Sequence, residues 1–385
     1  MSGIHSVFVL NTGSSSVKYR VVDAVSGEVA ATGLIDRIGE PGSDTPDHRA
    51  AIARILDELR GVPIDAVGHR IVHGGDRYVA ATIIDDEVER GIDALAPLAP
   101  LHNPPGLLGI RAAQAALPAL PQVAVFDTAF HATISPAART YAIDADLAAA
   151  HGIRRYGFHG TSYRIVSERT AAFLGRPLEE LRLIVLHLGN GASAAAISGG
   201  RSIDTSMGMT PLEGLVMGTR SGDLDPAVLL YLQRNAGLDV DGLDALLNRR
   251  SGLLGLAGRS DMREITAAAE SGDDAAALAL DVYLHRIRHY IGAYTAELGG
   301  LDALVFTAGV GENSAVVRAR AVDGLGVLGI EVDAAANVGA DRGARRISPE
   351  SSATARVPVL VVPTDEELQI ARETAAVLDG RDLRH

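Results

Sequence analysis

The stretch Val7-Phe8-Val9-Leu10-Asn11-Thr12-Gly13-Ser14-Ser15-Ser16-Val17-Lys18 decides the fold of this chain. Its first half is an apolar, β-branched run that predicts a buried strand, and a Gly/Ser turn then leads into a second strand over 17–22. The backbone N–H groups of such a turn can surround an anion. Lys18 is the one lysine among 35 lysine and arginine residues, which indicates that this position requires a compact ammonium charge. We interpret the stretch as a phosphate site; a serine-rich turn with a chance lysine is the alternative.

The same order of elements recurs later in the chain. Residues 7–30 predict strand, Gly/Ser turn, strand, turn and strand, and residues 183–203 repeat that order around Gly189-Asn190-Gly191 and Gly199-Gly200. Two similar hairpins, each opening one half of the chain, predict duplicated domains that face each other across a cleft. The repeat is short, and a chance origin is the alternative.

Alternating strands and helices predict an α/β chain. A long helix is predicted over 280–298, where apolar residues recur at steps of four and three. Residues 225–237 begin with Asp-Pro and end with Gly, as helices often do, and Thr364 with Glu367 has the capping-box spacing for a final helix. Strands are predicted over 7–10, 17–22, 67–72, 122–126, 183–188, 304–307 and 359–362.

Length and composition limit the classes of protein. A chain of 385 residues predicts about two domains. The net charge of -13 argues against nucleic acid or a membrane surface as the main partner, although arginines focused in a cleft can still hold ATP with a divalent cation. The lack of cysteine excludes disulfides, thiolate metal sites and cysteine nucleophiles. No apolar run approaches a membrane span and no secretion signal opens the chain, so we expect a cytoplasmic protein.

Two more strands are predicted to end in glycine turns of the kind that bind nucleotides. They are His187-Leu188-Gly189-Asn190-Gly191 and Phe306-Thr307-Ala308-Gly309-Val310-Gly311-Glu312-Asn313, the second leading toward a helix. Either one alone is also explained by an ordinary turn. Three such turns in one chain favour a nucleotide site, although not a Walker-type loop, because the only lysine does not follow a glycine.

Acidic and basic residues near these strands supply the predicted chemistry. Arg70 and Val72 are two residues apart on a predicted strand and therefore share a face, which would place a guanidinium beside an apolar wall. Arg220 lies in a glycine-flanked loop, and Asp127 follows an apolar strand, where α/β proteins place catalytic groups. Taken singly, each arginine is also explained by a surface ion pair and Asp127 by a strand-end cap.

Nine blocks, in order along nearly the whole chain, resemble the acetate kinase family. This resemblance implies the superfamily of acetate and sugar kinases, chaperone ATPases and actin, with two duplicated ribonuclease-H-like domains, an active site in the cleft between them, and usually a homodimer. The implied domains are 1–150 closed by 367–385, and a nucleotide-binding domain over 151–366. The blocks are Asn11–Lys18, Gly68–Gly75, Leu98–Pro104, Phe126–His131, Tyr156–Ser162, His187–Ser193, Asp204–Pro226, Phe306–Ser314 and Pro363–Ala371.

The resemblance also implies roles for individual residues. Arg70 holds the substrate carboxylate and takes part in catalysis with Asp127, the family's active-site acid. His159 and Arg220 stabilise the transition state. The acyl methyl group contacts Val72, Leu101, Phe158 and Pro211. Mg²⁺, which Mn²⁺ can replace, is assigned to Asn11 and Glu366. ATP or ADP is assigned to Lys18, His187, Leu188, Gly189, Asn190, Gly191, Asp261, Met262, Arg263, Gly309, Val310, Gly311, Glu312 and Asn313.

The implied reaction is reversible, Mg²⁺-dependent transfer of the ATP γ-phosphate to acetate by direct in-line displacement. Acetate is ionised at neutral pH, so no general base is needed, and we interpret Asp127 as a residue that positions metal-bound water or arginine. A propionate or butyrate kinase and an actin- or chaperone-like ATPase are the alternatives. The sequence departs from the family in a one-residue-shorter segment before Asp261, which leaves the adenine contacts open, and in Tyr163, where the family has histidine.

Overall fold

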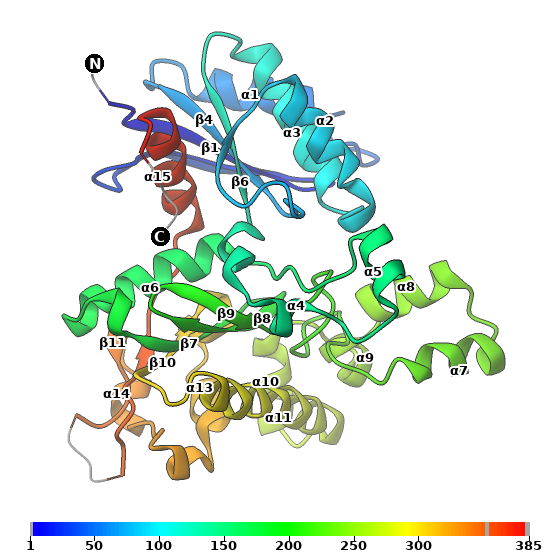
Figure 1. Ribbon diagram of the computed structural model, residues 1–385, viewed down its shortest axis with the longest axis vertical. Coiled ribbons are helices and arrows are strands. Elements are labelled where there is room, and N and C mark those ends of the chain that lie inside the picture. The colour runs from blue at the N-terminus through cyan, green and yellow to red at the C-terminus, as the bar shows by residue number, and fades with distance from the viewer. Residues whose placement is uncertain (1–2, 351–353, 382–385) are drawn as a thin grey trace. The chain divides into compact units, whose positions relative to one another are not determined.

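The computed structural model describes residues 3–350 and 354–381 and divides into two compact units (Figure 1). Unit 1 contains the described residues up to Ala132, Phe158–Ile165 and the described residues from Asp365 onward. Unit 2 contains Thr133–Gly157 and the described part of Val166–Thr364. The domain boundaries expected from the sequence, 1–150 with 367–385 and 151–366, stay a prediction.

Unit 1 is built on a six-stranded mixed sheet with the order β3-β2-β1-β4-β6-β5. The predicted hairpin forms the first part: β1 pairs antiparallel with β2, and Gly13 N–H closes the turn by donating to Ser16 O at 2.8 Å. β1, β4 and β6 are parallel neighbours, so their carboxyl ends meet at one edge. The strands are β1 (Ser6–Thr12), β2 (Val17–Asp23), β3 (Val29–Ile35), β4 (Ala66–Ile71), β5 (Thr82–Ile83) and β6 (Gln122–Phe126).

Helices cover both faces of this sheet (Figure 1). Phe8 and Leu10 of β1 pack with Ile52 and Ile55 of α1 and with Ala113 of α3 in one apolar core. α15 packs against β1, β2, β4 and β6. The helices are α1 (His48–Glu58), α2 (Asp86–Ala94), α3 (Asn103–Ala116) and α15 (Glu366–Leu378), with the first residues of α6 (Gly160–Leu174).

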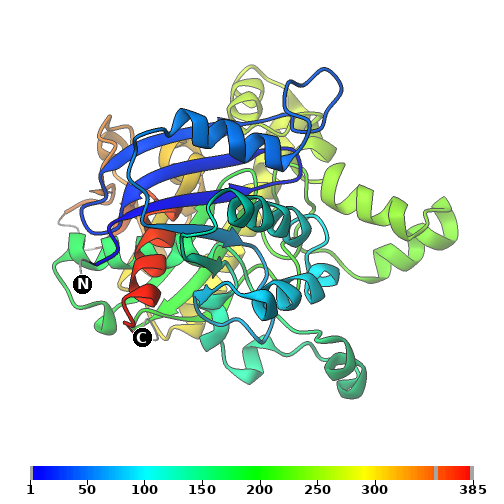
Figure 2. The ribbon, with the colours of Figure 1, turned by 90° about the horizontal axis from the view of Figure 1, so that it is seen from above.

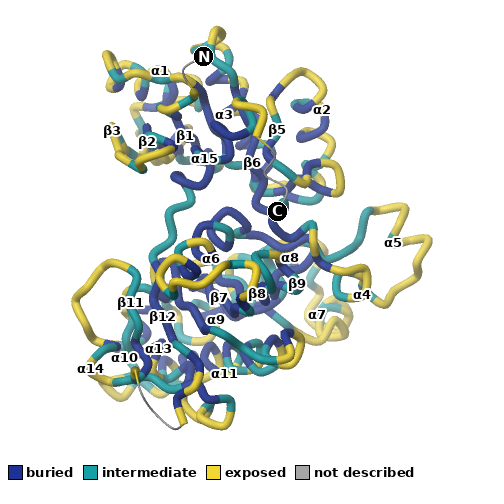
Figure 3. Tube along the Cα trace, turned by 60° about the vertical axis from the view of Figure 1, so that its left-hand side comes forward, coloured by how far each residue is buried: buried dark blue, intermediate teal, exposed yellow. Residues whose placement is uncertain are grey.

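Unit 2 repeats the sheet topology of unit 1. Its strands run β11-β12-β10-β7-β8-β9, with an antiparallel β7-β8-β9 meander, parallel β7, β10 and β12, and an antiparallel edge strand. The predicted duplication and fold class are confirmed. The buried strands stand out in both units in Figure 3. The strands are β7 (Arg182–Leu188), β8 (Ala192–Ser198), β9 (Arg201–Thr205), β10 (Ala303–Thr307), β11 (Arg345–Arg346) and β12 (Val359–Val361).

The helices of unit 2 include the predicted long helix, α11, whose apolar stripe is buried against β7 and β8. Figures 1 and 2 both show α7 extending away from the sheet. Besides the rest of α6, the helices are α4 (Pro136–Arg139), α5 (Ala145–His151), α7 (Ala227–Ala236), α8 (Val240–Arg249), α9 (Gly252–Ala257), α10 (Met262–Glu270), α11 (Asp274–Glu297), α12 (Ala308–Asn313), α13 (Ala315–Val322) and α14 (Ala334–Asn337).

Three local predictions were wrong. The cap of α15 is Asp365, which accepts from Leu368 N–H, and not Thr364. α7 begins at Ala227, one residue later than expected, although Asp225 still accepts from Ala227 N–H at 2.9 Å and Gly237 ends the helix in the left-handed region. The segment 308–313, expected to be a turn, is the helix α12.

Within the described ranges, every helix is too short or too polar to pass through a lipid bilayer.

Buried His69 predicts a pH dependence of stability. Its Nε2 lies 2.8 Å from Gln122 Oε1, and burial lowers the pKa of His69 to about 4. As pH falls below about 6.5, His69 of the unfolded chain becomes protonated while His69 of the folded chain stays neutral. The free energy of unfolding therefore has its full contribution from His69 above that pH and decreases as pH falls toward 4, by up to about 1.4 kcal/mol per pH unit. Urea unfolding at pH 7, 6 and 5 should show a shallower pH dependence for His69→Gln than for wild type. Equal pH dependence would contradict the assignment.

Candidate active site

Three predicted site residues lie at the same edge of the sheet in unit 1. Asn11 is near the end of β1, Arg70 is near the end of β4, and Asp127 directly follows β6. Because β1, β4 and β6 are parallel neighbours, their carboxyl ends are adjacent, which is where open α/β sheets bind ligands. Asn11 pairs with Lys18 across the β1–β2 hairpin, which brings the only lysine onto a strand beside this edge.

Arg70 and Asp127 form a bidentate ion pair. Arg70 Nε donates to Asp127 Oδ1 at 3.1 Å and Nη2 donates to Oδ2 at 2.6 Å, while Asp127 is only 1% exposed. Burial works to lower the pKa of Arg70, but the nearby charges of Asp127 and Glu366 outweigh it and raise that pKa above the ordinary value. The remaining nitrogen, Nη1, makes one long contact of 3.5 Å with Asn11 Oδ1. Asp127 thus fixes the guanidinium and leaves Nη1 available to an anion.

His159 is held next to Asp127 by an unusual backbone. Its φ of 59° lies in the left-handed region, which non-glycine residues adopt at a cost. Gly160 N–H donates to Asp127 O at 3.0 Å, and a Cβ at position 160 would overlap that carbonyl. Only glycine allows the backbone to approach this closely, so Gly160 is a residue that the sequence prediction missed. Its signal was present, as the glycine directly after the predicted histidine.

Two of the four predicted apolar contacts, Val72 and Phe158, lie beside His73. Val72 precedes His73 and is half-buried, and the buried ring of Phe158 lies edge-on to the His73 ring at 5.6 Å. Asn103 ties this segment to the start of α3 through two hydrogen bonds with the His73 backbone. Leu101, two residues before Asn103, is exposed. The argument from strand alternation fails at Val72, because β4 ends at Ile71.

Lys18 on β2 and Glu366 at the start of α15 are two further predicted residues of unit 1. Lys18 Nζ forms an ion pair with Glu367 Oε1 at 2.5 Å, so its ammonium is engaged by a carboxylate in this structure. Arg20 Nη1 lies 2.7 Å from Asp365 Oδ1. Glu366 is half-buried, and its Oε1 is buried without a hydrogen-bond partner among the described residues. An unsatisfied carboxylate oxygen of this kind is suited to a cation.

Unit 2 contains a pocket of about 620 Å³, a size typical of small-molecule sites. All three predicted nucleotide segments contribute to its wall, and Gly218 and Tyr283 also line it. A Cβ at Gly218 would overlap the Asn190 side chain, and Gly218 N–H donates to Asn190 O at 3.0 Å. The predicted residues that line the pocket are Gly189, Asn190, Asp261, Met262, Arg263, Gly309, Val310 and Asn313.

The other predicted nucleotide residues of unit 2 do not line this pocket. His187 and Leu188 are buried in β7. The Glu312 carboxylate turns back to accept from Ala308 N–H at 2.9 Å and from Thr364 N–H at 3.1 Å. These contacts explain why the segment is a helix: an acid four residues into it satisfies a donor at its start. Gly191 and Gly311 are likewise not among the lining residues.

Asp261 and Arg263 form the rim of the pocket. Asp261 caps α10 by accepting from Arg263 N–H at 2.8 Å, and the Arg263 side chain, which is exposed, returns to the same carboxylate. Hydrogen bonds from the Arg263 side chain and backbone lower the pKa of Asp261 to about 2. The carboxylate is therefore ionised at any physiological pH.

Arg220 and Pro211 lie together in unit 2. Arg220 Nη1 donates to Pro211 O at 2.9 Å, and burial lowers the pKa of Arg220. Among residues 3–350 and 354–381, no carboxylate forms an ion pair with this guanidinium. A largely buried arginine without a counter-ion is an unfavourable arrangement that a bound anion would relieve.

Comparisons with known proteins identify the family of the chain. A sequence profile of the acetokinase family matches residues 6–372. The chain is 61% identical to an acetate kinase of Leifsonia xyli, over 96% of this chain and 98% of the relative. The crystal structure of Porphyromonas gingivalis acetate kinase has a TM-score of 0.91 and 44% identity, covering 97% of this chain and 100% of that one.

A structure of a Francisella tularensis propionate kinase is similar to the same degree, with a TM-score of 0.91 and 40% identity over 96% of this chain and 99% of that one. The matches span nearly the full length of each protein. On the strength of the profile and of these relatives, the chain belongs to the acetokinase family.

Proposed function

We propose that this protein is a kinase that transfers the γ-phosphate of ATP to acetate, giving acetyl phosphate and ADP. The observation that carries the proposal is the carboxylate half-site of unit 1, by which we mean Arg70, Asp127, Val72 and Phe158. The nucleotide pocket alone would suit any ATP-dependent enzyme. Asp127 holds two nitrogens of Arg70 and leaves the third for a ligand carboxylate. Val72 and Phe158 supply apolar surface for one short acyl group.

The reaction requires alignment more than acid–base chemistry. Acetate is ionised at neutral pH, given a carboxyl pKa of about 4 to 5. One of its oxygens forms a bond to the γ-phosphorus as the bond from that phosphorus to the bridging oxygen of ADP breaks, so no proton moves in the forward direction. Catalysis then depends on positioning the two substrates and covering charge on the transferred phosphoryl group, roles that we give to Arg70, His159 and Arg220.

Asn11 and Glu366 fit a Mg²⁺ ion. Glu366 offers a buried carboxylate oxygen without a hydrogen-bond partner, and Asn11 offers an amide oxygen. Mg²⁺ prefers such oxygen ligands, takes few from the protein and keeps water and substrate phosphates. In line with that preference, the described part of the chain has no cluster of three or more His, Asp or Glu placed to hold a metal. When bound, the ion neutralises charge on the ATP phosphates.

The test is an acyl-hydroxamate assay with ATP, Mg²⁺ and a series of short carboxylic acids. We expect acyl phosphate with acetate and less with longer acids. Purified, folded protein that forms no acyl phosphate with any short acid would refute the proposal, and ATP turnover that is independent of the acid would favour the actin- or chaperone-like alternative.

A propionate kinase is the second candidate, since the Francisella tularensis protein is as similar in structure as the acetate kinase above. Comparing acetate with propionate on the wild-type protein under identical conditions separates the two, and Val72→Ala tests whether Val72 limits the size of the pocket. If Val72 limits the acyl chain, its truncation should raise the kcat/KM ratio of propionate to acetate by several-fold to tens-fold, since one methylene is worth about 1–3 kcal/mol in such pockets. Kinetics with both acids, and a melting curve, decide the matter: a lower Tm with an unchanged ratio removes Val72 from the pocket.

We further propose a cytoplasmic homodimer. Helix α7 is largely apolar, yet none of its residues is buried in the single chain, and Leu230 and Tyr231 are exposed. A second copy of the chain would remove such a surface from water. Sedimentation at micromolar concentration should give the mass of two chains, and a monomer would contradict this part of the proposal.

A further inference from the structure

Arg220 and Pro211 lie on a long irregular segment. No helix or strand occurs between the end of β9 at Thr205 and the start of α7 at Ala227. Segments of this length without regular structure are uncommon in compact proteins and are often functional, but a loop can position a guanidinium only if it is held in place. The residues that hold this loop are therefore of interest.

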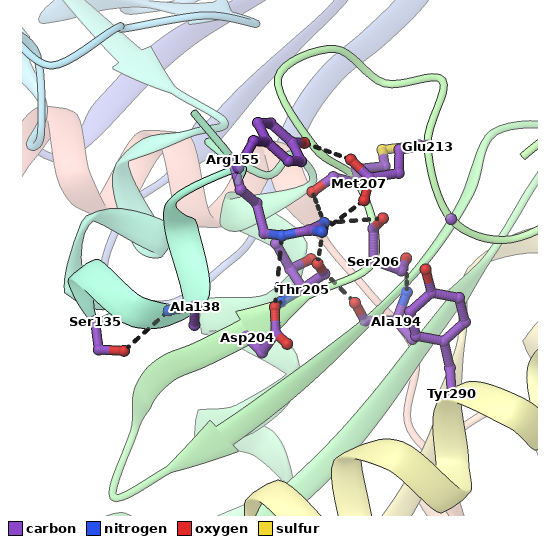
Figure 4. Close-up of polar contacts among 12 residues, drawn as sticks. Ser135, Ala138, Arg155, Ala194, Asp204, Thr205, Ser206, Met207, Glu213 and Tyr290 are labelled. Atoms are coloured by element: carbon purple, nitrogen blue, oxygen red, sulfur yellow. Dashed lines mark hydrogen bonds and ion pairs between the residues drawn. The ribbon is translucent and has the colours of Figure 1, made fainter. Parts of the chain in front are cut away.

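Arg155 anchors the beginning of the loop (Figure 4). Its Nη1 donates to three successive carbonyl oxygens, those of Thr205 at 2.8 Å, Ser206 at 3.3 Å and Met207 at 3.1 Å. Its Nη2 donates to Glu213 Oε1 at 2.6 Å. One guanidinium thus links Thr205, at the end of β9, to Glu213, eight positions further along the chain. The first part of the loop is held in a closed turn by these contacts.

Tyr141 completes this anchor. Its hydroxyl donates to Glu213 Oε2 and accepts from Met209 N–H, the latter at 3.1 Å. Burial and the Glu213 carboxylate raise the pKa of Tyr141, so the hydroxyl remains a donor at neutral pH. A Cβ at Gly208 would overlap both the Tyr141 hydroxyl and the Glu213 carboxylate, so the contact depends on glycine there.

Asp223 fastens the other end of the loop. Its Oδ1 accepts from Gly214 N–H at 2.8 Å, and its Oδ2 accepts from the Tyr290 hydroxyl at 2.8 Å. Gly214 follows Glu213, so the two anchors meet at adjacent residues. Pro211 is two residues from Glu213, and its carbonyl accepts the hydrogen bond from Arg220. The position of Arg220 is thereby linked to Glu213 through the backbone of three residues.

We propose that Arg155, Tyr141 and Glu213 are positioning residues for phosphoryl transfer, which fix the 206–223 loop so that Arg220 is in place before the substrates bind. This inference rests on the proposed function of Arg220. The three residues need not touch either substrate. Without the anchor, the loop adopts more than one arrangement and the guanidinium is correctly placed for only part of the time.

The test uses Glu213→Gln, Tyr141→Phe and Gly208→Ala. Glu213→Gln removes the negative charge that faces Arg155, and Tyr141→Phe removes both hydrogen bonds of the hydroxyl. Gly208→Ala displaces these side chains without changing a polar group. For each, kcat should fall about 10- to 100-fold, the scale expected when a catalytic group is misplaced by about 1 Å. KM for ATP should change little, because Gly218, where the loop meets the nucleotide pocket, is held separately by Asn190. Amide hydrogen exchange of peptides covering 206–223 should become faster in all three variants.

The matched control is Asp302→Asn. Asp302 accepts from Arg182 Nε at 2.9 Å and from Arg176 Nη1 at 3.0 Å, and it lies at the amino end of β10, away from the loop. Asp302→Asn should lower Tm but leave kcat and the amide hydrogen exchange of residues 206–223 as in wild type. The proposal is overturned if the three variants behave like this control, or if exchange in the loop is unchanged. Wild type that makes no acyl phosphate would instead refute the proposed function, while the exchange measurement still tests the anchor.

Discussion

Arg220→Ala lowers kcat by about 10²- to 10³-fold, the cost of removing one preorganised group that stabilises developing charge, while KM for ATP and for acetate changes far less. The expectation follows from the position of the guanidinium, which is largely buried, makes one hydrogen bond to Pro211 O, and has no carboxylate partner in the described part of the chain. An interaction made mainly in the transition state appears in the rate and not in ground-state binding. Steady-state kinetics with both substrates varied will measure the separation.

Arg220→Lys is the companion variant. It keeps the positive charge but loses the planar fork, so we expect only part of the rate to return. A Tm close to wild type in both variants shows that folding is unaffected. If Arg220→Ala changes KM alone and leaves kcat intact, the residue binds substrate in the ground state and does not stabilise the transition state.

Arg70→Ala should have two large effects. It removes the guanidinium that we propose to bind the acetate carboxylate, so kcat/KM for acetate should fall by about 10²-fold or more. A lost hydrogen bond to a charged group costs about 1.5–3 kcal/mol, and misalignment of acetate with the γ-phosphate adds to that cost. It also leaves Asp127, which is 1% exposed, without its partner, and breaking a buried pair from one side costs about 3–5 kcal/mol of unfolding free energy. Urea unfolding and acetate kinetics measure the two effects separately.

The double variant Arg70→Ala/Asp127→Ala separates stability from catalysis. Removing both charges relieves the unpaired carboxylate, so stability should recover in part while activity stays low. A double variant that regains activity together with stability would show that Arg70 serves folding only, and the carboxylate half-site would have to be placed elsewhere.

The parts of the fold that depend on local sequence could be predicted. The strands over 7–10 and 183–188 have apolar, β-branched residues and glycine turns after them, and the structure contains both hairpins. The long helix over 280–298 was readable from its period, because its apolar residues have to face the sheet. The duplication followed from these same local signals.

Two of the three wrong predictions have the same cause, which is a nearby acidic side chain that the local pattern did not take into account. Thr364 and Glu367 have the spacing of a capping box, but Asp365 is the cap and Glu367 is drawn to Lys18 on β2. The glycines at 309 and 311 indicated a turn, whereas the Glu312 carboxylate satisfies Ala308 N–H and lets a helix form.

Long-range pairs left no signal in a single sequence. The pairing of Arg70 with Asp127 joins β4 to the residue that follows β6, and that of Arg155 with Glu213 joins two loops, so neither has a characteristic spacing. The identities of the candidate residues could be inferred from motifs and resemblance. Which nitrogen is held and which is left for a ligand could be read only from the structure.

The most direct test of the account is ³¹P NMR of the wild-type protein with ATP and Mg²⁺, recorded with and without acetate. We predict that the γ-phosphate signal of ATP is converted into that of acetyl phosphate only when acetate is present, with one ADP formed for each acetyl phosphate. Release of inorganic phosphate at a rate that acetate does not change would contradict the central claim, because the chain would then hydrolyse ATP and not transfer its phosphate to a carboxylic acid.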